Sequence, residues 1–400
     1  MVSLRTQSTS HEAQCPAGPI QVKTSSVHGP GPTFNHESIP YTSSTIPYTP
    51  STIPYTPSSI KTSSSVILLE YDPETLPPPP SDQWTRFVCI SDTHTRTFAV
   101  PDGDVLLHSG DLTNTGTIAD FQKTMEWLFS LPHKVKIIIA GNHDLPLHRD
   151  WYDGAYRKWH NHVGKQDIKP ILDLLTGQRA NQAGLVYLQD SSYEFQAKPG
   201  GLLTPRQWSP YFFGWAFNYD RQDGKALVAK LPKTDILLTH GPPLEIFDRT
   251  RTGDKPGCAD LRARLPHLRP RLHLFGHIHE ARGGAIHAWD EDTDTLLEVQ
   301  NRMDEVSDDE AEDEDDDDDD ITAEALVEKA EKGVSPTETA QGMEMGGANG
   351  VVEQAAGGER EETVFVNASC WPAGAGAWRG THRVPFGGPG FQAVVVDLRD

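Results

Sequence analysis

From residue 86 onward, short apolar runs alternate along the chain with longer amphipathic stretches. The stretch 118–131 has apolar residues at helical spacing and is followed by Pro132, so it predicts one helix. Residues 145–181, which include several aromatic residues, are expected to form a helical cover. The apolar runs predict strands at 86–90, 105–109, 135–140, 185–188, 201–203, 235–238, 272–275, 295–299, 364–367 and 391–398. This alternation predicts an α/β (α+β) domain with a mainly parallel or mixed sheet, helices on its faces, and ligands carried by loops beyond the strand ends.

Two segments lack the apolar residues that a folded core needs. Residues 1–82 are dominated by serine, threonine and proline, and residues 302–362 are acidic and glycine-rich. Because neither segment can bury enough apolar surface to offset the entropy of ordering, we expect a disordered N-terminal tail and a disordered acidic insertion. The folded domain is then expected in two parts, 83–301 and 363–400.

The N-terminal tail contains a seven-residue repeat over residues 39–59, with proline in every unit. The prolines exclude a continuous coiled-coil helix. We interpret the repeat as an extended low-complexity tail; the alternative is a docking segment that is phosphorylated, since serine, threonine and tyrosine abound there.

The net charge of -22 is concentrated in one place, because the stretch 304–320 contains 14 acidic residues. The rest of the chain is only mildly acidic, which argues against a broad nucleic-acid-binding face. The acidic run is expected either to be a solvated, self-repelling insertion or to dock a basic protein partner.

Cysteine usage and hydropathy bear on the cellular setting. The cysteines, Cys15, Cys89, Cys258 and Cys370, are scattered without CxxC spacing, so neither a disulfide framework nor a cysteine zinc site is expected. No stretch approaches the roughly 20 apolar residues of a membrane helix, and the N-terminus lacks the apolar core of a signal peptide. These features predict an intracellular, cytoplasmic protein without a membrane partner.

The stretch 208–217 is too aromatic for an ordinary loop. It is expected either to pack in the core beneath a sheet or to form a wall of a substrate pocket.

Several of the predicted strands lead into clusters of Asp, Asn and His. Carboxylate, amide and imidazole ligands suit Mn, Fe, Zn or Mg, whereas the lack of sulfur disfavours a structural zinc finger. A lone histidine near a strand end is commonly just a hydrogen-bonded polar residue, so the joint order of the clusters is what indicates a metal site. We expect two metal ions, because two cations can neutralise the oxygens of a phosphate ester while binding nucleophile and substrate. The clusters are Asp92-Thr93-His94, Gly110-Asp111, Gly141-Asn142-His143-Asp144, Thr239-His240-Gly241 and Gly276-His277-Ile278-His279.

In this order the motifs resemble those of the calcineurin-like metallophosphoesterase superfamily, over residues 86–300 and 363–400. The segments 110–114, 239–244, 257–258 and 366–369 further resemble the branch of metallophosphoesterase-domain-containing proteins. The resemblance implies two packed mixed β-sheets flanked by helices, with a dinuclear metal centre at the strand ends. The ligands that it implies are Asp92, His94 and His279 for one ion, Asn142, His240 and His277 for the other, and Asp111 together with a water or hydroxide as bridges.

The resemblance also implies that His143 is not a ligand but touches the phosphate and protonates the leaving oxygen. Successive side chains of an extended segment point to opposite sides, so Asn142 can face a metal while His143 faces substrate. Asp144 is expected either to orient His143 or to cap the next turn. Ser109 and Asn114 are expected to support the Gly-Asp loop rather than to ligate. The other histidines expected to be surface or supporting residues are His108, His148, His160, His162, His273 and His287.

Together these expectations describe a metal-dependent phosphoester hydrolase, in which a hydroxide activated by two divalent metal ions (Mn, Fe or Zn) attacks in line. The resemblance implies a phosphodiesterase, with cyclic nucleotides among its substrates. Some members of the branch lack the first histidine of the last cluster and are poorly active, so His277 favours catalysis here. Two alternatives remain: a phosphomonoesterase acting on phosphoproteins or small phosphates, and a weakly active metal-binding interaction protein.

Overall fold

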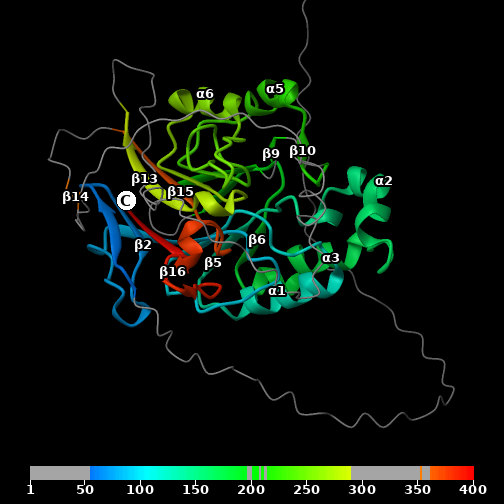
Figure 1. The fold of residues 1–400 in the computed structure, drawn as a ribbon, viewed down its shortest axis with the longest axis horizontal. Helices are drawn as coiled ribbons and strands as arrows, with labels where there is room; N and C mark the ends of the chain where they lie inside the picture. Colours follow the sequence, from blue (N-terminus) through cyan, green and yellow to red (C-terminus); the bar gives the residue numbers. More distant parts are fainter. Residues whose placement is uncertain (1–54, 196–200, 207–208, 211–213, 290–351, 354–360) are drawn as a thin grey trace, which may run out of the picture. The chain divides into compact units, whose positions relative to one another are not determined.

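The structure, a computed structural model, describes residues 55–195, 201–206, 209–210, 214–289, 352–353 and 361–400. These residues form two larger β-sheets, two short two-stranded ribbons and six α-helices (Figure 1). The ribbons pair β10 (Asn218–Tyr219) with β9 (Ser209–Pro210) and β16 (Trp378–Arg379) with β17 (His382–Arg383). Short 3-10 helices lie at Pro73–Thr75, Leu145–Leu147, Arg221–Asp223, His279–Ala281 and Ala375–Ala377.

The first sheet has eight strands and is mixed. Its central strands β3, β4, β5 and β6 run parallel, whereas β18 lies antiparallel between β3 and β2. The strand order is β14 (Val352–Glu353), β1 (Ser58–Lys61), β2 (Ser65–Glu70), β18 (Val394–Arg399), β3 (Trp84–Ile90), β4 (Val105–His108), β5 (Val135–Ile138) and β6 (Leu185–Tyr187).

The second sheet has six strands and is also mixed. Strands β8, β11, β12 and β15 are parallel, and an antiparallel strand closes each edge. The strand order is β13 (Gly283–Ala288), β15 (Glu362–Asn367), β12 (Leu272–Phe275), β11 (Ile236–Thr239), β8 (Gly201–Arg206) and β7 (Tyr193–Phe195).

The two sheets pack face to face through one apolar cluster. Side chains alternate between the two faces of a strand. In β3, accordingly, Phe87 and Cys89 enter the cluster that also holds Leu272 and Val364 of the second sheet. Val88 and Ile90 point the other way, toward the helices. The predicted fold of two packed mixed sheets is therefore confirmed.

Helices cover the outer face of each sheet. The first sheet is covered by α1 (Ile118–Ser130), α2 (Arg149–His160), α3 (Ile168–Thr176) and α4 (Gln178–Gln182), and the second by α5 (Gly224–Val228) and α6 (Ala259–Leu268). In Figure 1, α5 and α6 lie together at the side of the described part opposite α1 and α3. The helix predicted at 118–131 is confirmed, and it begins at a capping box in which Thr117 and Asp120 bond reciprocally.

The domain begins earlier than the predicted boundary at residue 83. Strands β1 and β2 lie inside the predicted tail, and β2 pairs with both β1 and β18. The Ser/Thr/Pro-rich composition, averaged over 82 residues, concealed the apolar run that begins at Val66. Ile67 in that run is fully buried, so it contributes to the core like any central-strand residue.

The acidic insertion also ends earlier than predicted. Strand β14, within 302–362, pairs with β1, and β15 already starts at Glu362. The valine pair at 351–352, which interrupts the polar composition, is the sequence feature that marks this end. The expected strand at 295–299, the acidic run 304–320 and most of the repeat at 39–59 lie outside the described residues.

Among the helices of the described segments, none has the length and apolar character that crossing a membrane requires.

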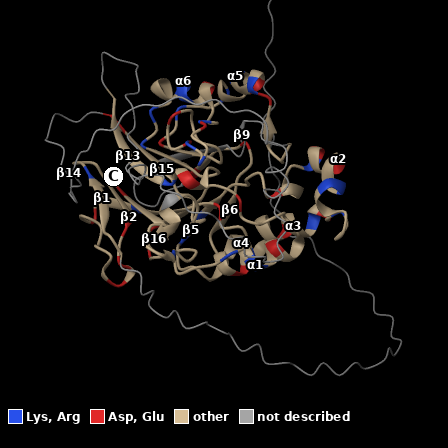
Figure 2. Cartoon of the chain, in the orientation of Figure 1, with Lys and Arg blue, Asp and Glu red and all other residues tan. Residues whose placement is uncertain are grey.

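Basic and acidic positions are interspersed on the helices; α2, for example, carries Arg149, Asp150, Asp153, Arg157 and Lys158 (Figure 2). Both signs of charge are thus present on this helix.

Candidate metal centre

The Asp, Asn and His clusters converge because they follow parallel strands. Strand β3 leads to Asp92 and His94, β4 to Asp111, and β5 to Asn142, all in the first sheet. In the second sheet, the parallel strands β11 and β12 lead to the three remaining histidines, His240, His277 and His279. Since the carboxyl ends of parallel strands share an edge, the packed sheets bring both sets of side chains to one place.

The backbone of the ligand loops adopts conformations that L-residues rarely take. Positive φ angles occur at Asp92 (54°), His94 (43°), Asp111 (53°) and His277 (72°). Such angles cost free energy and persist only where the surrounding structure fixes them, which commonly happens at functional sites. They turn the chain sharply at the strand ends, so that successive loops can aim side chains at a common point.

Glycine is required where these loops touch. A Cβ at Gly276 would collide with the Asp92 carboxylate and Ser91, and a Cβ at Gly141 would collide with the Asp111 carboxylate and backbone. The glycines of the GNHD and GHxH motifs therefore allow close approach of ligand loops from different strands.

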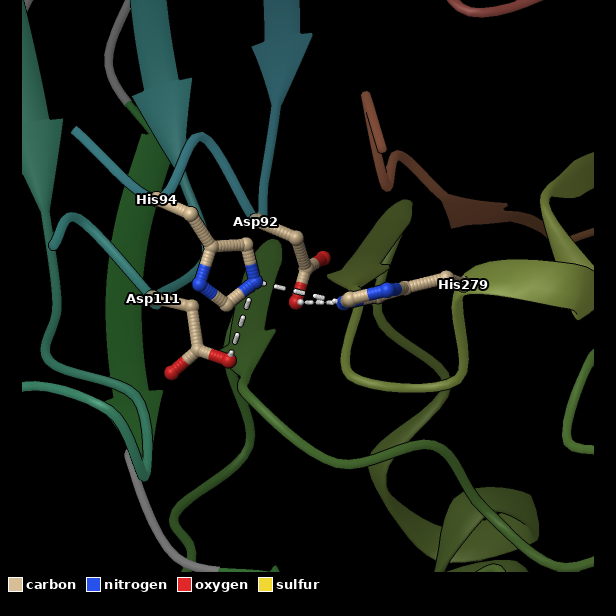
Figure 3. A group of neighbouring side chains, drawn as sticks. All are labelled: Asp92, His94, Asp111 and His279. Carbon is tan, nitrogen blue, oxygen red and sulfur yellow. Dashed lines mark hydrogen bonds and ion pairs between the residues drawn. The ribbon is translucent and has the colours of Figure 1, made fainter. Parts of the chain in front are cut away.

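The first group of candidate ligands is Asp92, His94, Asp111 and His279, whose ligand atoms all lie within 4.8 Å of one another (Figure 3). His94 Nε2 lies 3.3 Å from His279 Nε2 and 3.8 Å from Asp111 Oδ2. His279 Nε2 is 3.4 Å from Asp92 Oδ1. Two carboxylates and two imidazoles thus converge on a space of the size that a metal ion occupies.

The second group is Asp111, His240 and His277, which meets the same distance limit. His240 Nε2 lies 3.3 Å from Asp111 Oδ2 and 2.8 Å from Asn142 Oδ1. The other ring nitrogen of His240, Nδ1, donates to the Ser109 carbonyl at 3.0 Å, which leaves Nε2 to face the cluster. The two groups share only Asp111.

The two groups are also joined through the backbone. The His277 N–H donates to Asp92 Oδ1 at 3.0 Å, so a residue of the second group hydrogen-bonds a carboxylate of the first. The structure thus brings together the seven residues that the sequence predicts as metal ligands.

Burial and charge shift the pKa values of these groups in opposite directions. Burial alone would raise the pKa of Asp92, but the hydrogen bond and charge of His279 hold that pKa well below its usual range. Burial would lower the pKa of His240, but the neighbouring Asp111 carboxylate raises it to about 9. For His277, burial lowers the pKa more than the Asp111 and Asp92 carboxylates raise it, so the pKa falls to about 3.

The donor set fits divalent metal ions. Asp92 and Asp111 are 0% and 1% exposed, and their ion-pair partners among the described residues are imidazoles rather than lysine or arginine. Buried carboxylates are paired or coordinate metals, and carboxylate, imidazole and amide donors together suit Mn, Fe or Zn. The cluster is a candidate site for two such ions, with Asp111 in the position to contact both.

His143 is held at the edge of the cluster by three contacts. Its Nδ1 lies 2.7 Å from the Asn114 carbonyl, and because a carbonyl can only accept, Nδ1 carries the proton and Nε2 is left for a ligand. Its ring stacks on Trp215 at a centroid distance of 4.2 Å and meets His94 edge-on at 4.6 Å. Asn114 thus supports the site through its backbone carbonyl.

Asp144 takes neither of the two roles expected for it. Its carboxylate does not cap the following turn, and His143 bonds to Asn114 instead. Its two oxygens accept from the backbone N–H groups of Gly141, Leu112 and Thr113 and from the Thr113 hydroxyl. Asp144 therefore ties the loop after β5 to the loop after β4. Burial and the nearby Asp111 carboxylate raise its pKa to about 7.

The six histidines that were expected to be surface or supporting residues lie outside both ligand groups. His108 and His273 are fully buried and each pairs with a threonine hydroxyl at 2.9 Å, on Thr93 and Thr239 respectively. His148 accepts from the Phe217 N–H at 2.8 Å. These three histidines support the fold. The buried positions of His108 and His273 could not be inferred from the polarity of histidine.

Three residues near the cluster were not singled out from the sequence. Trp215, part of the aromatic run, contacts His143, while Trp371 lies with its ring centroid 5.2 Å from that of His94. Arg96 lies over the Trp371 ring at 4.7 Å. The signal for Trp371 was available: it follows β15, which is parallel to β12, so this strand end reaches the same edge.

Comparisons with known proteins agree with this geometry. Residues 85–281 match the family model of the calcineurin-like phosphoesterases. The chain is 40% identical over 225 residues to "Metallophosphoesterase domain-containing protein 1" of Homo sapiens and to the protein of the same name of Mus musculus. Each match covers 53% of this chain and 65% of the relative. "UPF0046 protein C25E10.12" of Caenorhabditis elegans is 36% identical over 228 residues, which cover 53% of this chain and 74% of that protein. The chain therefore belongs to the calcineurin-like phosphoesterase family.

Proposed function

We propose that this chain hydrolyses phosphoesters and prefers diesters to monoesters. The observation that supports the proposal most directly is the position of Asp111, whose carboxylate belongs to both groups of candidate ligands. A carboxylate in this position would help to hold two divalent ions, which together could neutralise the phosphate oxygens of an ester and activate water.

The chain supplies ligands for both ions. Asp92, His94 and His279 would hold one, Asn142, His240 and His277 would hold the other, and Asp111 would contact both. When bound, two divalent ions supply Lewis-acid neutralisation of the phosphate oxygens and activation of the attacking water. Mn, Fe and Zn all match this donor set.

His143 is the proposed proton donor. Its Nδ1 is bonded to the Asn114 carbonyl, so Nε2 is the nitrogen that can reach a substrate oxygen. As the phosphorus–oxygen bond breaks, the electron pair goes to the leaving oxygen, and the Nε2 proton of the imidazolium neutralises it. The ring then returns to its neutral form with Nδ1 still protonated.

The substrate class is proposed from the relatives' branch rather than from the pocket. Resemblance to the metallophosphoesterase-domain-containing proteins favours phosphodiesters, with cyclic nucleotides as specific candidates. The carboxylate and imidazole cluster would serve a phosphomonoester as well, so the choice between the two ester classes is one for experiment.

The test compares bis-p-nitrophenyl phosphate with p-nitrophenyl phosphate, using protein stripped of metal and reloaded with Mn²⁺. We expect faster turnover of the diester, and loss of that turnover in Asp111→Ala, which removes the shared ligand. Asp102→Ala, at an exposed position, is the matched control and should retain full activity. Faster turnover of the monoester would instead support a phosphatase. Stoichiometric metal binding without turnover of either ester would contradict the proposal and favour a metal-binding interaction protein.

A further inference from the structure

Two tryptophans flank the metal cluster, and they differ in what covers their faces. Trp215 is 6% exposed, and its ring contacts those of His143, at a centroid distance of 4.2 Å, and of Trp159, at 3.9 Å. A ring packed in this way has little surface left for a ligand. Trp371 is only half-buried, with its ring centroid 5.2 Å from His94 and 6.1 Å from His279. The accessible aromatic surface is therefore on the side of His94 and His279.

Arg96 lies on this accessible tryptophan. Its guanidinium carbon is 4.7 Å from the Trp371 ring centroid, and the side chain is exposed. Stacking of guanidinium on indole orients the planar group and leaves the N–H donors at its edge available. The indole itself rests against Phe386, at 6.1 Å.

Both residues are attached to the strand end that carries the ligands. The Arg96 N–H donates to the Thr93 carbonyl at 2.7 Å, which closes the turn containing His94. The Cys370 N–H, next to Trp371 in sequence, donates to the Ser91 carbonyl at 3.0 Å. The backbone at Arg96 and next to Trp371 is thus hydrogen-bonded to the loop that carries Asp92 and His94.

The positive charge of Arg96 is not neutralised by an ion pair within the described part of the chain. None of the described carboxylates forms an ion pair with it, and its guanidinium contacts the Trp371 ring. The buried carboxylates of the neighbouring cluster, Asp92 and Asp111, pair with imidazoles. An arginine that lies over an aromatic ring and has N–H donors available matches an oxyanion, which accepts two parallel N–H bonds.

We propose that Arg96 and Trp371 form a subsite for a second oxyanion of the substrate. This oxyanion is a phosphate or carboxylate group that is separate from the scissile phosphate. The subsite rests on the proposed function, because it defines which phosphoesters the same centre accepts. Esters that carry a second negative group are preferred over otherwise equal neutral ones.

The kinetic test uses diesters that share one leaving group. In p-nitrophenyl 4-carboxyphenyl phosphate the second aryl group carries a carboxylate, and in the 4-carbamoylphenyl ester the same position is neutral. We expect kcat/KM of the native chain to be about fivefold higher or more for the carboxylate, through a lower KM, since hydrogen bonds to charged groups are stronger than neutral ones. A 4-phosphonophenyl ester separates a preference for phosphoryl groups from one for carboxylates.

Arg96→Gln should remove this preference, because kcat/KM for the carboxylate ester should fall to the value for the neutral ester. Arg96→Lys, which keeps the charge but not the planar fork, should restore part of it. The matched control is Arg157→Gln on α2, because Arg157 is also exposed and lies over an aromatic ring, that of Tyr156, at 5.4 Å. Equal activity of the native chain on both esters, or an equal loss on both in Arg96→Gln, would overturn the subsite.

A binding titration separates this proposal from the proposed function. Calorimetry on the Mn²⁺-loaded chain compares 4-carboxyphenylphosphonate with 4-carbamoylphenylphosphonate and needs no turnover. Tighter binding of the carboxylate that disappears in Arg96→Gln supports the subsite even if no ester is hydrolysed, in which case only the proposed function fails. Equal binding of the two phosphonates overturns the subsite even in an active enzyme.

Discussion

The imidazole of His143 lies stacked on the indole of Trp215, with ring centroids 4.2 Å apart and planes 27° from parallel. The same indole also contacts that of Trp159, with ring centroids 3.9 Å apart. Together with the hydrogen bond to the Asn114 carbonyl, this stack fixes the plane of the His143 ring and therefore the direction of Nε2. Within the aromatic run, Trp215 is thus buried and also contacts His143.

Replacing Trp215 should impair proton donation selectively. We expect Trp215→Leu to lower kcat about tenfold for an alkyl ester with a poor leaving group, because the reoriented His143 no longer meets the leaving oxygen. Hydrolysis of a p-nitrophenyl ester should change much less, since p-nitrophenolate leaves without a proton. A leaving-group series measured at saturating substrate checks this.

The control for that series is Trp159→Leu, which removes the neighbouring indole without removing the ring that touches His143. Trp215→Phe keeps an aromatic face and should restore most of the lost rate. An equal loss on good and poor leaving groups in Trp215→Leu would show that the indole supports the fold rather than the orientation of His143.

Asp144 should contribute to the free energy of unfolding, although it is not a predicted metal ligand. Asp144→Ala leaves the Gly141, Leu112 and Thr113 donors buried without an acceptor, so we expect a loss of about 3 kcal/mol in the free energy of unfolding. Urea unfolding of the metal-stripped protein measures it.

Asp144→Asn, which retains one oxygen acceptor, should lose less than Asp144→Ala. The exposed Asp102→Asn should change stability by less than about 0.5 kcal/mol. If Asp144→Ala were as stable as the native chain, the hydrogen bonds that join the two loops would not contribute as inferred.

Metal binding should be coupled to proton release at His240. Asp111 raises the pKa of His240 to about 9, so without metal this imidazole is protonated at neutral pH, and a cation must displace the proton from Nε2. Mn²⁺ affinity should therefore rise with pH up to about 9, with release of about one proton at pH 7.5. Titration calorimetry in two buffers of different ionisation enthalpy measures the number of protons.

Stability of the stripped protein should show the opposite trend. A pKa raised from 6.5 to about 9 contributes stability that is present below pH 6.5 and is lost as pH rises through 9. The contribution is at most about 3 kcal/mol. His267→Gln, at an exposed helix position, should leave both trends unchanged. Metal binding without proton release between pH 7 and 8 would contradict the assignment of His240.

The convergence of the ligands could be anticipated from the sequence because strand ends obey simple geometry. Parallel strands place their carboxyl ends on one edge, so Asp92, Asp111 and Asn142 had to be neighbours once β3, β4 and β5 were recognised. The presence of two separate sheets could not be derived in this way. Their packing depends on which strands pair, and hydrophobic periodicity shows only that a strand exists.

Contacts between residues that are far apart in the sequence and belong to no recognised motif could not be predicted from the sequence. Asp144 hydrogen-bonds Leu112 and Thr113, 32 and 31 residues away, and no local spacing encodes such a partner. Trp371 reaches His94 across an even longer separation, through the β15 strand end. The early start of the domain was missed for a different reason, because composition was averaged over a segment in which β2 is short.

That early strand provides a further prediction, for deletions. A chain that begins at residue 55 should fold as the full chain does, because β1 and β2 are kept. A chain that begins at residue 83 should aggregate or unfold, because it leaves β18 as an unpaired edge and exposes the residues that Ile67 covers. Size-exclusion chromatography and thermal unfolding of the two deletions distinguish these outcomes.

A point substitution tests the same strand without shortening the chain. Ile67 is fully buried between the sheets, so Ile67→Ala should cost about 2–5 kcal/mol through lost burial and the remaining cavity. Leu69, two residues further along β2, lies on the same face and packs against the same cluster, but it is only half-buried, so Leu69→Ala should cost clearly less. If both substitutions had equally small effects and the chain starting at residue 83 were stable, the core would be complete without β2. The domain boundary would then lie at residue 83, as predicted from the sequence.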